Sequence, residues 1–126
     1  MKSAYLVSTE DSFEEDLWRA AATLGADVRE HAAQLRDDQG RLVTIFGQLD
    51  PKHAADWREG PFEHRGPGPA PDLSAAVAVS VECRWEDLFA SSVARMAALL
   101  PYQAWVVDDG GVVWPAADVD PAGVRL

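Results

Sequence analysis

Residues that could bind a metal ion occur together in one stretch of the sequence, between positions 53 and 64. His53 and Asp56 are three residues apart, a spacing that places two side chains on one face of a helical turn, and Glu63 and His64 follow. Imidazole nitrogens and carboxylate oxygens are common metal ligands. The spacing matches no zinc or calcium motif, however. Two interpretations stay open, a weak metal site or four solvated loop side chains, and the sequence favours the second, with no metal and no cofactor.

The sequence lacks the residue sets on which common catalytic mechanisms depend. No serine stands in a Gly-x-Ser-x-Gly elbow, and in the glycine-rich run 66–69 every second residue is a proline, which has no N–H to offer a phosphate. Cys83 is the only cysteine, and it stands beside Arg84 without a histidine near it in sequence. We therefore expect a structural thiol, no disulfide and no catalytic residue, with enzymatic activity as the less favoured alternative.

Acidic and aromatic side chains indicate protein recognition instead. The chain has 21 acidic and 11 basic residues, and its formal net charge is −10. This charge repels phosphate backbones and anionic lipids, so we expect no nucleic acid and no membrane surface as a partner, but a protein with a basic surface. The alternative is that the charge serves only solubility. The residues predicted to contact the partner are Glu10, Glu14, Asp16, Trp18, Trp57, Asp108 and Asp109.

Some of these residues also have a purely structural interpretation. Glu14 and Asp16 fall in the first turn of a predicted helix, where carboxylates interact favourably with the exposed N–H groups. Trp18 falls at the side of that helix's apolar stripe, where it could be exposed. Trp57 either stands exposed as an aromatic anchor or folds back with Phe62 over the sheet, and we favour the second interpretation slightly.

Hydrophobic periodicity predicts the elements that must position these side chains. Apolar runs predict strands at 4–7 and 75–81, and apolar residues at helical spacing predict helices at 12–24 and 85–99. Hairpins are expected at 28–35 with 42–49, and at 104–107 with 112–114, around turns rich in aspartate and glycine.

The stretch 51–72 has a different composition, with five of the eight prolines of the chain. Because proline lacks a backbone donor, we expect an irregular loop here with at most one helical turn, at 53–58. A loop of this length is functional or mobile. We predict a single domain, 1–126, whose halves 1–50 and 73–126 are joined by this loop.

The predicted order of elements is a β-α-β-β unit that occurs twice. It favours an α+β two-layer sandwich in which a mostly antiparallel sheet carries both helices on one face. Two helices shield one face only, so the other face must meet solvent, the 51–72 loop, a protein partner or a second copy of the chain in a homodimer. The acidic pair Glu10–Asp11 comes too early for a secretory signal, and no apolar run is long enough to span a membrane. We therefore expect a cytoplasmic location.

Three segments of the second half resemble the strand, helix and hairpin ending of small acidic bacterial immunity proteins: VECRWEDLF at 81–89, VVDDG at 106–110 and DVDP at 118–121. The resemblance covers less than half of the chain. Such proteins neutralise secreted toxins in the cytosol of the producing cell, so the resemblance implies a non-enzymatic inhibitor of a basic protein. The alternative function is a small-molecule-binding or metal-dependent enzyme-like domain with a pocket under the 51–72 loop.

Overall fold

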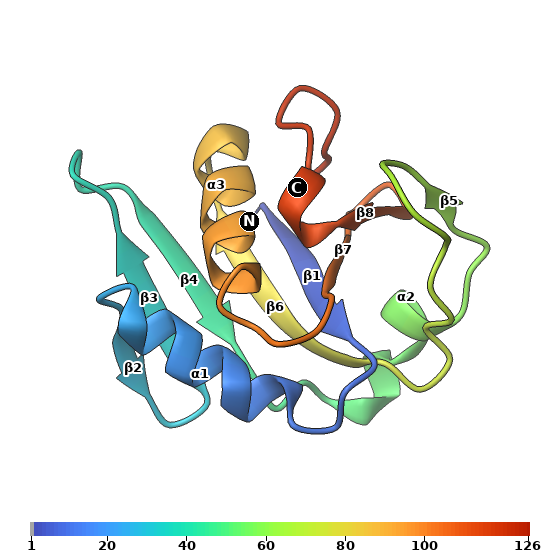
Figure 1. Cartoon of the computed structure of the whole chain (residues 1–126), viewed down its shortest axis with the longest axis horizontal. Coiled ribbons are helices and arrows are strands. Elements are labelled where there is room, and N and C mark those ends of the chain that lie inside the picture. Colours follow the sequence, from blue (N-terminus) through green and yellow to red (C-terminus); the bar gives the residue numbers. More distant parts are fainter. Residues whose placement is uncertain (1) are drawn as a thin grey trace.

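The computed structural model describes residues 2–126, through which one sheet of eight strands runs. The helices are α1 (Phe13–Thr23), α2 (Ala55–Arg58) and α3 (Glu86–Ala97). The strands are β1 (Ser3–Ser8), β2 (Asp27–Arg29), β3 (Ala32–Arg36), β4 (Leu42–Phe46), β5 (Glu63–His64), β6 (Val77–Cys83), β7 (Trp105–Val107) and β8 (Val112–Pro115) (Figure 1). Their order is β2-β3-β4-β6-β1-β7-β8-β5, and every neighbouring pair is antiparallel except β8 with β5.

The two halves of the chain interlock at the centre of the sheet. β1 pairs with β6 along its whole length and with β7 on its other side, while β6 pairs with β4. β1 and β4 therefore run parallel on either side of β6, and the chain connects them through α1 and the β2–β3 hairpin. In the same way β6 and β7 run parallel on either side of β1, and α3 connects them. These are two interleaved split β-α-β units. The predicted α+β sandwich and its pseudo-repeat are confirmed, with β2 as an additional strand in the first half.

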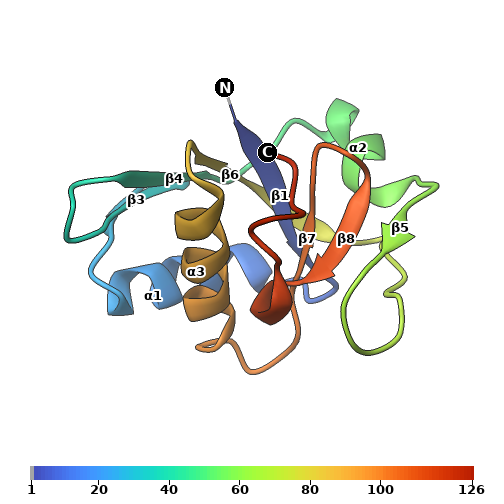
Figure 2. The same cartoon turned by 90° about the horizontal axis from the view of Figure 1, so that it is seen from above.

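Both long helices cover the same face of the sheet, which we call the inner face (Figure 2). The apolar stripe of α1 buries Phe13 and Leu17, and Gly25 ends the helix with a φ of +89°. The stripe of α3 buries Phe89 and Val93 against the same core. The helices thus begin and end within two residues of the predicted positions, because periodicity and a left-handed glycine are local signals.

The predicted strand at 28–35 is wrong, since the chain turns back in its middle. β2 ends at Arg29, β3 begins at Ala32, and the two strands pair with each other. The turn is made without glycine or proline by His31, whose φ of 58° is left-handed. Because that turn lacks the usual punctuating residues, the sequence offered no signal for it.

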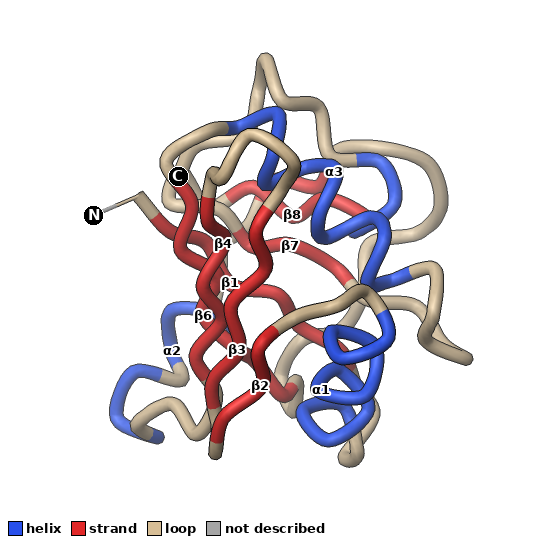
Figure 3. Tube along the Cα trace, turned by 90° about the vertical axis from the view of Figure 1, so that its left-hand side faces the viewer, coloured by secondary structure: helices blue, strands red, loops and turns tan. Residues whose placement is uncertain are grey.

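The other face of the sheet, the outer face, is covered on one side only. Side chains of the segment 49–73 pack on this face against β1, β6, β7 and β8, and Figure 3 shows α2 on the side of the sheet away from α1 and α3. The segment includes a 3-10 turn at Pro51–His53 and the predicted single helical turn as α2. It also includes β5, which extends the sheet beside β8 where the sequence predicted only irregular chain. An apolar cluster seals this covered half, and its buried members are Val7, Trp57, Leu73, Ala76, Ala78, Val107 and Val113.

The open half of the outer face lies on β3, β4 and β6. Side chains alternate between faces along a strand, so Val43 and Ile45 are buried under the helices while their neighbours point outward. Phe46 is 41% exposed. The other outward residues of this open half are Ala32, Gln34, Arg36, Leu42, Thr44, Ser80 and Glu82. The expected uncovered face is therefore present, but only on this side. No helix within residues 2–126 is both long and apolar enough to cross a membrane.

Candidate functional site: an acidic cleft on the outer face

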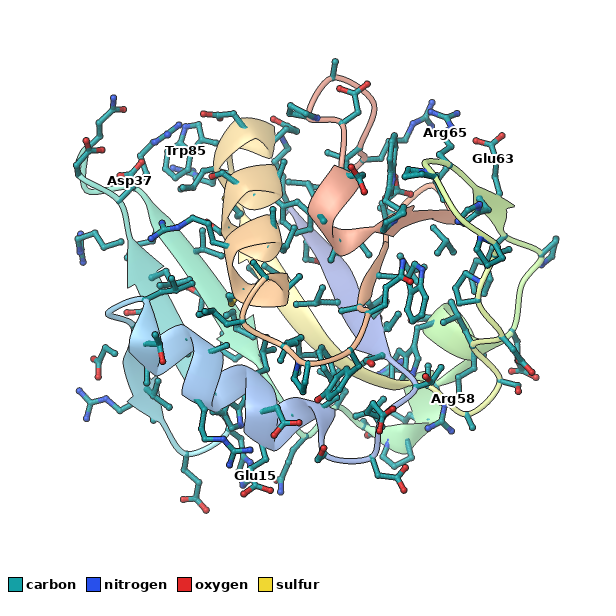
Figure 4. All side chains as sticks on the ribbon, viewed as in Figure 1. Glu15, Asp37, Arg58, Glu63, Arg65 and Trp85 are labelled. Atoms are coloured by element: carbon teal, nitrogen blue, oxygen red, sulfur yellow. The ribbon has the colours of Figure 1, made fainter. Side chains whose placement is uncertain are left out.

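The four candidate metal ligands are not brought together. Within residues 2–126, no three histidine, cysteine or acidic side chains are placed to hold a metal ion. The carboxylate of Glu63 pairs with Arg65 at 2.5 Å at the edge of the molecule (Figure 4), and the Arg65 guanidinium lies over the ring of Trp114, 5.5 Å from its centroid. Asp56 instead accepts a hydrogen bond from Tyr5. His53 lies exposed on the 3-10 turn, and the Nε2 atom of His64 is buried in strand β5 without a hydrogen-bond partner. The geometry does not support the metal alternative.

Glu14 is used inside the fold. Its Oε1 accepts the backbone N–H of Gln48 at 2.7 Å, and its Oε2 lies 3.2 Å from Nδ1 of His31. A Cβ atom on Gly47 would lie 2.5 Å from the Glu14 carboxyl carbon, so this approach needs a glycine. His31 and Gln48 both have left-handed backbones, with φ of 58° and 48°. The carboxylate thus stabilises two strained positions and ties α1 to the ends of β2 and β4.

Asp16 and Trp18 are also held by neighbours. Asp16 accepts hydrogen bonds from the hydroxyls of Tyr102 and Ser12, which, with the nearby Arg19, hold the pKa of its carboxyl below the ordinary value. Trp18 is half-buried against the inner core. Glu10 is exposed, and it does not line the cleft described below.

Asp108 is 5% exposed and lies at the centre of a hydrogen-bond network. Its Oδ1 accepts the N–H groups of Gly110 and Val112, and its Oδ2 accepts the indole N–H of Trp114 and the N–H of Arg125. The side chain closes the β7–β8 turn and fixes the carboxyl-terminal segment to it. The sequence predicted that Asp108 contacts a partner, but in the structure its side chain is not accessible for such a contact. An aspartate two residues before Gly110 is typical of such a turn, so this signal was present.

Trp57 covers the sheet, in agreement with the second of its two interpretations. It is 4% exposed, and its indole N–H donates to the carbonyl of Ala76 at 3.2 Å. Its ring packs on that of Tyr5, with centroids 5.0 Å apart. The exposed-anchor alternative is wrong for this residue. Its burial instead places α2 over β1 and thereby positions Asp56.

A cleft of about 320 Å³ opens where α2, β1 and the β7–β8 turn meet, and we call it the acidic cleft. Its lining residues are Ser3, Ala4, Tyr5, Asp56, Val107, Asp108, Asp109 and Gly111. β1 contributes Tyr5, whose hydroxyl donates to Oδ2 of Asp56 at 3.0 Å. Asp109 is exposed at the side of the cleft formed by the β7–β8 turn, and its backbone N–H donates a hydrogen bond to the carbonyl of Arg125 at 2.8 Å.

The electrostatics of this cleft are negative. Neither Asp56 nor Asp109 forms an ion pair with any basic side chain in the described part of the chain. Burial, the hydrogen bond to Asp56 and the charges of both aspartates raise the pKa of Tyr5 to about 12. Glu82, also without an ion pair in the described residues, lies opposite Ser3 on β6 and adds a carboxylate to the open half of the outer face.

The arrangement is suited to binding a cation. A phenol whose pKa is about 12 stays protonated at neutral pH, so Tyr5 is a poor general base. Two unpaired carboxylates about a polar cleft match a guanidinium or ammonium group. Asp109 was predicted from the sequence for this role. Tyr5 and Asp56 were not assigned to it, since only the packing of α2 on β1 brings them together.

A second cavity lies under the beginning of the 51–72 loop, as the alternative function requires. It measures about 210 Å³, and its lining includes Glu14, Trp57 and Arg58. This is below the roughly 300 Å³ at which small-molecule sites begin. Comparisons of this chain with protein-family models, with curated proteins and with solved structures find no match.

Proposed function

We propose that this chain is a non-enzymatic protein-interaction domain that binds a partner with a basic surface through the acidic cleft and the adjoining open half of the outer face. The observation that carries the proposal is the presence of two carboxylates, Asp56 and Asp109, that face one cleft without an ion pair. A charge left unpaired beside an accessible sheet surface favours a complementary charge on a partner.

The open half of the outer face supplies the apolar and polar contacts that such an interface also needs. Phe46, with 41% of its surface exposed, lies in one cross-strand row with Ser80 and Tyr5, so this row leads from the open half into the acidic cleft. Interfaces commonly combine an aromatic contact with polar groups at its border. The net charge of −10 would also accelerate association with a basic protein.

The resemblance of 81–89 and 106–110 to immunity proteins extends this proposal to an inhibitor that acts in the cytoplasm on a basic toxin. The alternative is that the open half of the outer face binds a second copy of the chain in a homodimer. Light scattering during size-exclusion chromatography distinguishes the two, because a dimer through this surface would leave Phe46 and Glu82 unavailable to another protein.

The test is capture of partners from the source cell by the purified chain, at low and at high salt, followed by affinity measurement with the identified partner. Asp109→Asn removes one cleft charge from an exposed position and should preserve the fold. We expect its affinity at low salt to fall about fivefold or more, and the difference to shrink at high salt, because screening weakens the lost attraction.

The matched control is Asp38→Asn, which changes the net charge equally at an exposed hairpin turn away from the cleft. It should bind as the unaltered chain does. Equal loss of affinity in both variants would show that only the total charge matters, and no loss in Asp109→Asn would refute the proposed surface.

A further inference from the structure

Among residues 2–126, the serine and charged side chains that are buried are those of Ser8, Ser92 and Asp108, and two of the three have hydrogen-bond partners. Ser8 donates to the carbonyl of Gln103 at 3.0 Å, and Asp108 accepts the four bonds described above. Ser92, on α3, is 4% exposed and makes no side-chain hydrogen bond within residues 2–126. A buried hydroxyl without a partner requires an explanation.

Ser92 lines a cavity of about 310 Å³ on the inner side of the sheet, opposite the acidic cleft. The cavity lies between the end of α1, the middle of α3 and the β3–β4 hairpin, whose tip carries Asp37 in Figure 4. The hydroxyl oxygen of Ser92 is not among the sealed, unpartnered atoms of the described chain, so it keeps access to this space. The apolar part of the lining consists of Leu24, Leu35, Val43 and Leu88.

The lining contains one cation that has no partner within the described residues. Arg95 lies on α3 at the same face as Ser92 and makes neither an ion pair nor a hydrogen bond in the described residues. Arg36 borders the cavity only as a residue of β3, because its side chain lies on the outer face, where it donates to the carbonyl of Gly40. Asp37 is neutralised by Arg41 at 2.7 Å, so the unpaired charges of the lining are the guanidinium of Arg95 and the carboxylate of Asp38.

We propose that this cavity is a binding site for a small organic carboxylate with a short apolar tail. The guanidinium of Arg95 would bind the carboxylate at the mouth, the Ser92 hydroxyl would donate to it, and the tail would lie on the leucine and valine side chains. A few placed polar groups over an apolar floor are the usual composition of small-molecule sites. The volume lies at the lower end of the range for such sites, so the ligand is small.

The test is titration of the purified full chain with hexanoate, hexylamine and hexan-1-ol, followed by two-dimensional amide NMR spectra. We expect hexanoate to shift the amides of Leu24, Asp38, Ser92 and Arg95, and the amine and the alcohol to shift them far less. Arg95→Gln, at an exposed position, should weaken hexanoate binding about tenfold, since it removes a charge-assisted hydrogen bond. Ser92→Ala should weaken it about threefold without loss of stability, because no internal partner is left unsatisfied.

Two controls separate this site from a general effect of charge. Arg84→Gln removes an exposed arginine elsewhere and should bind hexanoate normally, and Asp38→Asn should bind it at least as tightly as the unaltered chain. The proposal is overturned if no probe shifts the cavity amides, if hexylamine shifts them as strongly as hexanoate, or if Arg95→Gln binds hexanoate with unchanged affinity.

Discussion

Two neighbouring aspartates, Asp108 and Asp109, should respond in opposite ways to the same substitution. Asp108→Asn replaces one acceptor oxygen by an amide group that can only donate. In the unaltered chain, Oδ1 of Asp108 accepts hydrogen bonds from the N–H groups of Gly110 and Val112 at 2.9 and 3.0 Å. Its Oδ2 accepts hydrogen bonds from the indole N–H of Trp114 and the backbone N–H of Arg125, both at 3.1 Å. Whichever way the amide is oriented, two donors then face another donor.

The expected cost follows from these contacts. A hydrogen bond to a charged acceptor contributes about 1.5–3 kcal/mol, so the loss of two gives about 3–6 kcal/mol before relaxation. Because the hairpin can adjust and admit water, we expect the free energy of unfolding to fall by at least about 3 kcal/mol. This is a large part of the stability of an ordinary domain.

Equilibrium unfolding in urea, followed by tryptophan fluorescence and far-ultraviolet circular dichroism, measures this loss. Asp109→Asn is the matched control, since it makes the same change in charge one residue away at an exposed position, and it should stay within about 0.5 kcal/mol of the unaltered chain. If Asp108→Asn were as stable as Asp109→Asn, the hydrogen-bond network would not stabilise the fold and the reasoning would fail.

Two further predictions concern the covered half of the outer face. Trp57→Ala should lower the free energy of unfolding by about 3–5 kcal/mol, because it removes a buried ring and its bond to Ala76; a loss below about 1 kcal/mol would contradict that packing. Tyr5 should titrate in the folded chain at about 12, so the protonated phenol stabilises the fold below pH 10 and this contribution is lost as the pH rises toward 12. The pKa of Tyr102 is also raised to about 12, so the two phenols titrate together in the unaltered chain. In a phenolate absorbance titration, Asp56→Asn should move one of them, Tyr5, to a lower pKa, whereas an unchanged titration curve would refute the contact.

Much of the fold could be predicted from the sequence because its signals are local. The apolar stripes of α1 and α3, the left-handed Gly25 and the continuous apolar run of β6 each depend on residues within a few positions of one another. The turn at His31 could not be predicted, since a left-handed residue other than glycine is stabilised by Glu14, which is distant in sequence.

The candidate site as a whole could not be predicted from the sequence, because it depends on contacts between residues that are far apart in the chain. Asp108 and Asp109 are chemically identical neighbours, yet the carboxyl-terminal segment packs over the first and leaves the second exposed. Asp56 becomes part of a cleft only because Trp57 buries its ring against β1.

By itself, the sequence determined the two long helices, the sandwich and the surplus of negative charge, since these depend on local periodicity and composition. The tertiary structure alone decided which strands are neighbours, which half of the outer face is covered and which carboxylates stay unpaired. The reason is that burial and hydrogen bonding join residues far apart in the chain, and these contacts determine whether a carboxylate is bound within the fold or left available to a partner.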